Sequence, residues 1–180
     1  MPRLLRDDID RFYDYDIHIP SRTIFLGTEV DEDMAERFLK AMCLLDPAGG
    51  EIKIVMNNLG GDEYHGLAIY DAIASSKCHV TITVYGHAMS MGSWILQAAD
   101  TRVMAPNATL MIHYGSWGQE DHVKYVRASN KEMERVNLLM ESAYMSRTNI
   151  TLKRLRKMLE DETYLSPADT VKYGFADRIL

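Results

Sequence analysis

The stretch HVTITVYGHAMSMGSWILQAA (residues 79–99) carries the change from strand to helix that decides the fold. Its first part, 79–85, is rich in β-branched residues and predicts a strand. A corner lined by glycine and alanine follows, and the apolar run 91–99 predicts a helix. Ser90 stands at this corner, at the positive end of the predicted helix, where free N–H groups hold an oxyanion. The pattern is that of a nucleophile elbow; an ordinary helix N-cap is the alternative.

Two other segments place small and polar residues at predicted strand ends. The β-rich run 51–56 leads to the paired glycines at 60–61, before a predicted helix over 64–75. His113 ends another short β run, 109–112. Because sites in open α/β folds assemble at the ends of strands, we expect the serine, the glycines and the histidine to meet. Histidine titrates near neutrality, so it can take the proton of a serine hydroxyl and later give it to a leaving amine.

The rest of the chain alternates strands and helices. A strand over 23–26 and a helix over 31–45 are followed by two further strand–helix units through residue 99. Such repeats predict a mostly parallel sheet with helices on its faces. One long helix is predicted over 121–148, about 40 Å in length and too long to bury against a small body. We expect one domain over 1–180, with 1–11 as an N-terminal segment.

Composition narrows the function classes. The 180 residues are 47% hydrophobic and 26% charged, as in an ordinary globular domain, and the net charge of −6 argues against nucleic acid as the main partner. Two isolated cysteines, Cys43 and Cys78, suit a reduced compartment, and neither a secretory signal nor a membrane span is evident. We therefore expect a cytoplasmic protein. Histidine spacing suggests no metal site, and no cofactor is predicted.

Ordered motifs run through nearly the whole chain, from about Phe12 to Leu180. They are IFLG (24–27), GG (60–61), GLAIYD (66–71), AMSMG (88–92), MIH (111–113), YLSPA (164–168) and YGFAD (173–177). In these the chain resembles the ClpP family of serine peptidases, the proteolytic subunits of the ATP-dependent Clp protease. The resemblance implies an α/β fold of the ClpP/crotonase type, and the departures described below suit a divergent or phage-type member.

The resemblance also implies roles for individual residues. Ser90 matches the family nucleophile and His113 matches the general base. Gly61 and Met91 match the positions whose backbone N–H groups form the oxyanion hole. The implied activity is that of a serine endopeptidase that cleaves peptides or unfolded proteins inside a ring-shaped chamber.

The third member of the implied triad falls in the acidic run 160–162. Aligned on the following tyrosine, the family aspartate position holds Glu162. A glutamate can orient a histidine, but it is one methylene longer than an aspartate. Asp161 is the rival and needs a shift of the loop by one residue. The alternative for the whole run is a solvated helix end.

Residues around the expected substrate site depart from the family. The family commonly has Ser-Pro before the paired glycines, and this chain has Asn58-Leu59. After the glycines the family is usually apolar, whereas this chain has Asp62 and Glu63, which bias the site toward basic or polar side chains. Ser116 and Trp117, just beyond the histidine, are also assigned to substrate binding.

Assembly and partners follow from the resemblance. The family forms stacked heptameric rings, interlocked by a protruding handle that the long helix matches, and it docks an AAA+ Clp ATPase in an apolar groove. In this chain the residues at the aligned groove positions form a poor apolar binding surface. They are Lys53, Val55, Ser75, Thr83 and Tyr85. Docking is therefore doubtful, and an ATPase-independent processing peptidase is one alternative. A non-catalytic or regulatory ring subunit is another.

Overall fold

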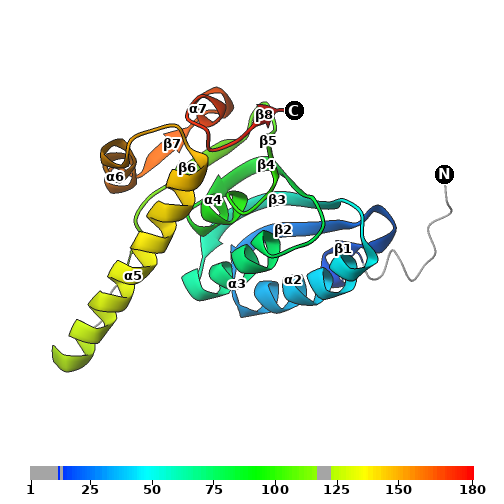
Figure 1. Cartoon of the computed structure of the whole chain (residues 1–180), viewed down its shortest axis with the longest axis horizontal. Coiled ribbons are helices and arrows are strands. Elements are labelled where there is room, and N and C mark those ends of the chain that lie inside the picture. The colour runs from blue at the N-terminus through cyan, green and yellow to red at the C-terminus, as the bar shows by residue number, and fades with distance from the viewer. Residues whose placement is uncertain (1–11, 13, 117–122) are drawn as a thin grey trace.

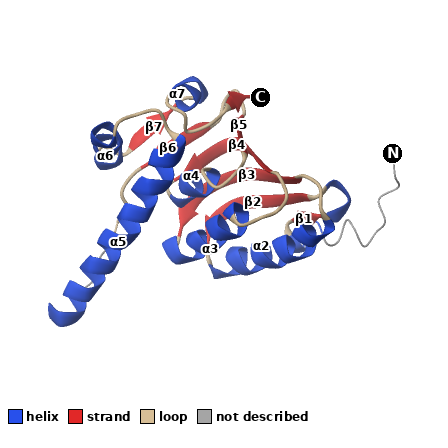
Figure 2. Cartoon of the chain, in the orientation of Figure 1, coloured by secondary structure: helices blue, strands red, loops and turns tan. Residues whose placement is uncertain are grey.

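The computed structural model describes residues 12, 14–116 and 123–180. Its strands are β1 (Ile17–His18), β2 (Thr23–Val30), β3 (Ile52–Gly61), β4 (Val80–Met89), β5 (Thr101–Met104), β6 (Thr109–Ile112), β7 (Thr163–Leu165) and β8 (Arg178–Ile179). Its helices are α2 (Glu32–Leu45), α3 (Glu63–Ala74), α4 (Met91–Leu96), α5 (Val123–Arg147), α6 (Leu152–Glu160) and α7 (Pro167–Lys172), with 3-10 turns η1 (Ile19–Ser21) and η2 (Asp46–Ala48). The mixed α/β class is confirmed (Figures 1 and 2).

The strands form one mostly parallel sheet, as predicted. Its path runs β1-β2-β3-β4-β5-β8, and β6 joins β4 off this path and carries β7. Only the β1–β2 and β6–β7 pairings among the described residues are antiparallel. The strand β4 changes its partner along its length. Its residues 81–84 pair with β5, and its residues 87–89 pair with β6. The change of partner occurs at Gly86, which has a φ of 73°.

This pairing corrects one expectation. Residues 86–89 were expected to line a corner, but they continue β4 as far as Met89, and the corner is reduced to Ser90. The reason is non-local, because β6 supplies hydrogen-bond partners to 87–89. The following helix also ends earlier than expected, at Leu96 instead of residue 99.

The core lies between the sheet and the helices α2 and α3, which pack against one face of it (Figure 1). Along β3 the side chains of Ile52, Ile54 and Met56 are buried, whereas Lys53 is exposed. This alternation follows the period of two residues in a strand and covers only one face. The other face of this part of β3, with Lys53 and Val55, is therefore less buried.

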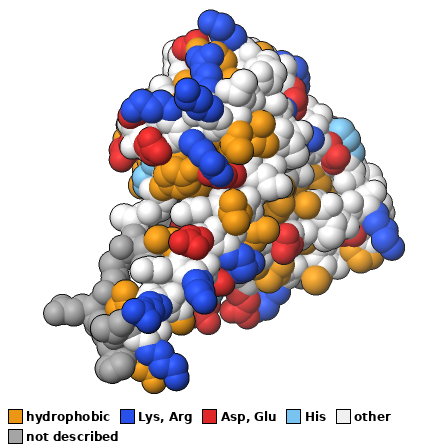
Figure 3. All heavy atoms as spheres, turned by 60° about the vertical axis from the view of Figure 1, so that its left-hand side comes forward, with side chains coloured by type: hydrophobic (Ala, Val, Ile, Leu, Met, Phe, Trp, Pro, Cys, Tyr) orange, Lys and Arg blue, Asp and Glu red, His pale blue; other side chains and the backbone are white. Residues whose placement is uncertain are grey.

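The helix α5 covers 123–147 of the predicted 121–148, and residues 121 and 122 lie outside the described residues. Near its C-terminal end Val136, Met140 and Tyr144 are buried, and the N-terminal half projects away from the sheet (Figure 1). On the face that includes this helix, hydrophobic side chains lie among the charged ones (Figure 3). Its role as a handle between rings stays a prediction. Within the described ranges, no helix has the length and apolarity that crossing a membrane requires.

Candidate active site

Ser90 and His113 meet because β4 and β6 run parallel and end together. Met89 pairs with Met111, and the backbone N–H of Ser90 donates to the carbonyl of Met111 at 3.0 Å. His113 follows two residues later and turns its ring back toward the serine. Its Nε2 lies 2.8 Å from Ser90 Oγ, within hydrogen-bond distance. The structure thus brings together the two residues that the sequence predicted as nucleophile and base.

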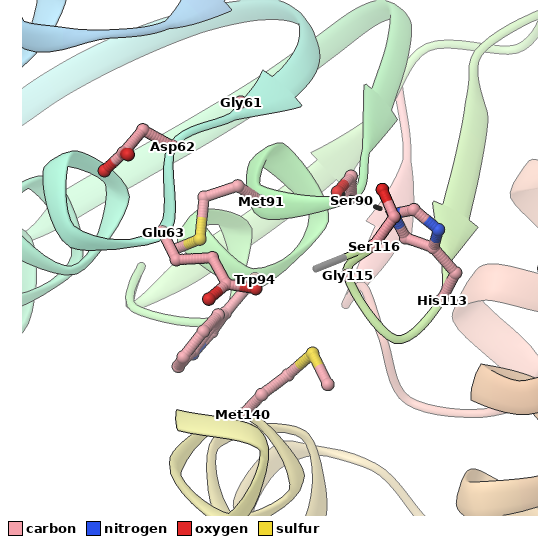
Figure 4. A pocket seen from close by; sticks show the side chains of 10 residues that line it. All are labelled: Gly61, Asp62, Glu63, Ser90, Met91, Trp94, His113, Gly115, Ser116 and Met140. Atoms are coloured by element: carbon pink, nitrogen blue, oxygen red, sulfur yellow. Dashed lines mark hydrogen bonds between the residues drawn. The ribbon is translucent and has the colours of Figure 1, made fainter. Parts of the chain in front are cut away.

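The backbone of Ser90 favours the elbow over the helix-cap alternative. Its φ of 50° and ψ of −122° lie in a region that residues with a Cβ rarely adopt. Ser90 occupies the N-cap position of α4, yet its hydroxyl makes no capping hydrogen bond to that helix. Instead the hydroxyl points toward His113 (Figure 4). A strained residue whose side chain serves no cap is typical of a functional position.

Glu162, and not Asp161, lies beside the histidine. Glu162 Oε2 is 3.9 Å from His113 Nδ1, which is within ion-pair range but too long for the hydrogen bond that a triad needs. The other oxygen, Oε1, accepts a hydrogen bond from the hydroxyl of Tyr164 at 2.9 Å. Asp161 instead accepts from Lys157 Nζ at 2.5 Å, at the end of α6. Glu162 is thus in the right place, but its side chain is 54% exposed and held by the tyrosine.

The paired glycines support the elbow from the end of β3. Gly60 has a φ of 98°, and a Cβ at this position would lie 2.6 Å from the Cβ of Ser90. The buried side chain of Asn58 fixes this turn: its Oδ1 accepts from Gly60 N at 2.8 Å, and its Nδ2 donates to Thr28 O at 3.1 Å. The departure at Asn58 therefore supports the turn that carries Gly61. Sequence reasoning assigned no role to Asn58 or Gly60, although the paired glycines were the signal.

A pocket of about 300 Å³ contains most of the predicted site residues. Figure 4 displays its lining, which comprises Gly61, Asp62, Glu63, Ser90, Met91, Trp94, His113, Gly115, Ser116 and Met140. Gly61 and Met91, the predicted oxyanion-hole residues, thus lie in one pocket with the serine. Trp117, also predicted to bind substrate, lies outside the described residues.

Two lining residues were not expected from the sequence. Trp94 lies one turn into α4, beyond the serine, and was interpreted only as part of an apolar helix. Met140 comes from α5, 50 residues further along the chain than the serine, so no local pattern could place it here. Both are buried, and the indole Nε1 of Trp94 has no hydrogen-bond partner among the described residues.

The residue after the histidine is anchored to the helices behind it. The hydroxyl of Tyr114 donates to Glu141 Oε1 at 2.6 Å, and the guanidinium of Arg156 donates to both oxygens of Glu141 at 2.9 Å. Burial, with the hydrogen bond to Glu141, raises the pKa of Tyr114 to about 12. Hydrogen bonds from Arg156 hold the pKa of Glu141 below its usual value. This network fixes the end of β6 against α5 and α6 and so helps to position His113.

The site offers hydroxyl, imidazole and carboxylate groups rather than a metal-binding cluster. In the part of the chain that the structure describes, no three side chains of histidine, cysteine, aspartate or glutamate gather closely enough to hold a metal ion. The chemistry that these residues support is proton transfer from a hydroxyl to an imidazole.

Comparison with known proteins identifies the family of the chain. The family model described as Clp protease matches residues 8–180. The protein named ATP-dependent Clp protease proteolytic subunit from Deinococcus radiodurans is 34% identical over 176 residues, which cover 95% of this chain and 86% of that relative. The match spans every strand and helix described above, and it includes Ser90, His113 and Glu162. The chain therefore belongs to the Clp protease family.

Proposed function

We propose that this protein is a serine endopeptidase that hydrolyses peptides or unfolded proteins through Ser90, His113 and Glu162. The observation that carries the proposal is the 2.8 Å contact between Ser90 Oγ and His113 Nε2, made by a strained serine whose hydroxyl caps no helix. Family membership and the peptidase name of the relative support the same reaction class. Hydrolysis of a short fluorogenic peptide, and its loss on replacing the serine, tests the proposal.

In the proposed mechanism, His113 Nε2 takes the proton of Ser90 as Oγ attacks the scissile carbonyl carbon. The backbone N–H groups of Gly61 and Met91 stabilise the oxyanion that forms. Collapse of this intermediate breaks the C–N bond, and the histidine gives its proton to the leaving amine. A water molecule, deprotonated by the same histidine, then hydrolyses the acyl-enzyme. Glu162 orients the imidazole and stabilises its protonated form after moving closer to Nδ1.

A second candidate function is that of a ring subunit with a regulatory role and no catalysis. The observation that favours it is the 3.9 Å separation between Glu162 Oε2 and His113 Nδ1. A subunit without a working acid would retain the fold and the assembly but hydrolyse no peptide. Peptide turnover by the purified protein distinguishes the two candidates directly.

We expect the protein to assemble into closed rings, as heptamers stacked in pairs, with Ser90 facing an internal chamber. The physical reason is exposed apolar surface on α5, where Leu138 is 60% exposed and Leu139 is 40% exposed. Light scattering at micromolar concentration should report a mass many times the 20.5 kDa of one subunit. A stable monomer under these conditions would refute the ring chamber.

Coupling to a generic AAA+ Clp ATPase is expected to be weak or absent. Lys53 and Thr83 lie on the same open face of the sheet, on neighbouring strands, and both are at least partly exposed. Covering a lysine ammonium with an apolar loop is costly unless a charge pairs with it.

Mixing the protein with such an ATPase, ATP and a tagged folded substrate should therefore give no ATP-dependent degradation, while short peptides are still cleaved. Such an enzyme would work as an ATPase-independent processing peptidase. Efficient degradation of the folded substrate would contradict this expectation.

A further inference from the structure

The side chain of Glu63 places a carboxylate in the pocket. No other described residue forms a hydrogen bond with its Oε2. Its side chain leaves the first turn of α3 and lines the pocket that contains Ser90. The atom Oε2 is buried and has no hydrogen-bond partner among the described residues. The neighbouring acid is different, because Asp62 Oδ1 accepts from the N–H groups of Tyr64 and His65 and so caps the helix. Of the two acids, only Glu63 has a buried carboxylate oxygen without a hydrogen-bond partner among the described residues.

Glu63 is half-buried, and its one buried, unpartnered oxygen makes a cationic partner favourable here. Burial, with the charge of Asp62, raises the pKa of Glu63 above its usual value. On the far side, Oε1 lies close to Gly115: a Cβ added there would be 2.5 Å from this oxygen, so the glycine leaves room for the carboxylate. A cation bound at Oε2 would offset the free-energy cost of desolvating the carboxylate, which no described residue offsets at this oxygen.

The rest of the pocket accepts a long apolar stem. Met91, Trp94 and Met140 line it with sulfur, aromatic and methylene groups. In Figure 4 the Glu63 carboxylate and the Trp94 ring lie on one side of the pocket, and Ser90 with His113 lies on the other. A side chain that starts at the serine and crosses this space meets apolar walls first and a carboxylate at its end. Lysine and arginine have this form, with a methylene stem and a charged tip.

We propose that Glu63 is a specificity-determining residue that selects lysine or arginine at the substrate residue whose carbonyl Ser90 attacks. The inference rests on the proposed peptidase function and adds the substrate class to it. An apolar side chain such as leucine would fill the stem region but leave Oε2 without a partner. An acidic side chain would be repelled by the negative charge of the Glu63 carboxylate. Glutamine could bond to the carboxyl group but would not supply the charge.

The test is a series of fluorogenic tripeptides that differ only in the residue before the cleaved bond: lysine, arginine, glutamine, glutamate or norleucine. Norleucine has nearly the shape of lysine without the charge. With the wild-type protein we expect kcat/KM for lysine and arginine to exceed that for norleucine and glutamine at least about tenfold. The Glu63→Gln variant should lower the lysine-to-norleucine ratio about tenfold or more, because it removes the charge and keeps the shape.

A matched control removes the same charge outside the pocket. Asp71→Asn, on an exposed part of the same helix, should leave the lysine-to-norleucine ratio unchanged. If the wild-type protein cleaves norleucine or glutamine as fast as lysine, the inference is wrong and the peptidase proposal stands; this comparison needs no variant. An unaltered ratio in Glu63→Gln also overturns it. If no peptide is cleaved and no fluorophosphonate reacts with Ser90, the proposed function fails and the inference fails with it.

Discussion

Replacing Ser90 by alanine is expected to lower kcat/KM for a short peptide by at least about a thousandfold. The substitution removes the hydroxyl that lies 2.8 Å from His113 Nε2, so no nucleophile remains for the imidazole to activate. Alanine has the same backbone preference as serine at the positive φ of this corner, and the hydroxyl caps no helix. The fold should therefore survive. Steady-state hydrolysis and light scattering of the same preparation would measure both effects.

The control for this prediction is Ser142→Ala, which removes an exposed hydroxyl on α5 at a position outside the proposed active site. It should leave hydrolysis within about twofold, as surface substitutions usually do. Hydrolysis by Ser90→Ala at a rate near that of the wild-type protein would show that another group is the nucleophile.

Neutralising Glu162 is expected to lower kcat by at least about a hundredfold, because the charge that orients the imidazole and stabilises its protonated form is lost. Glu162→Gln keeps the length of the side chain and its capacity to bond with Tyr164, so the loss reports the charge. Asp161→Asn is the matched comparison, one residue earlier in the same loop. It breaks only the exposed pair with Lys157, and such pairs contribute about 0–1 kcal/mol. Kinetics of the two variants on one peptide measure the difference.

The opposite ranking of these variants would assign the triad to Asp161 and would require the loop to shift by one residue. Equal and small effects would support the regulatory ring subunit instead. A structure with a peptide-like inhibitor bound gives an independent check: the distance from Glu162 to His113 Nδ1 should shorten from 3.9 Å to hydrogen-bond length.

The local parts of the fold could be predicted from the sequence. The helix α2 lies close to its predicted bounds, because it has a polar N-cap and an apolar stripe with helical spacing. The short strands β1, β5 and β7 were not predicted. They are short, and they exist through their partners in the sheet.

The candidate site likewise has residues that could be predicted from the sequence and residues that could not. Ser90, His113 and the glycine pair were found because each follows a strand, and parallel strands end at one edge. The contribution of Met140 could not be found, because it depends on how α5 packs against α4. From the sequence, Asp62 and Glu63 received the same predicted role. Their difference depends on which carboxylate caps α3, and this is decided by backbone geometry at the helix start.

The position of a fluorophosphonate adduct on the native protein tests most directly whether Ser90 is the nucleophile. The reagent phosphonylates a serine, with loss of fluoride, only when a neighbouring base activates the hydroxyl. Mass spectrometry of the digested protein should find the adduct on the peptide that contains Ser90, and His113→Ala should abolish the reaction. An adduct on a different serine, or the absence of any adduct on the assembled protein, would contradict the proposal that Ser90 is the nucleophile.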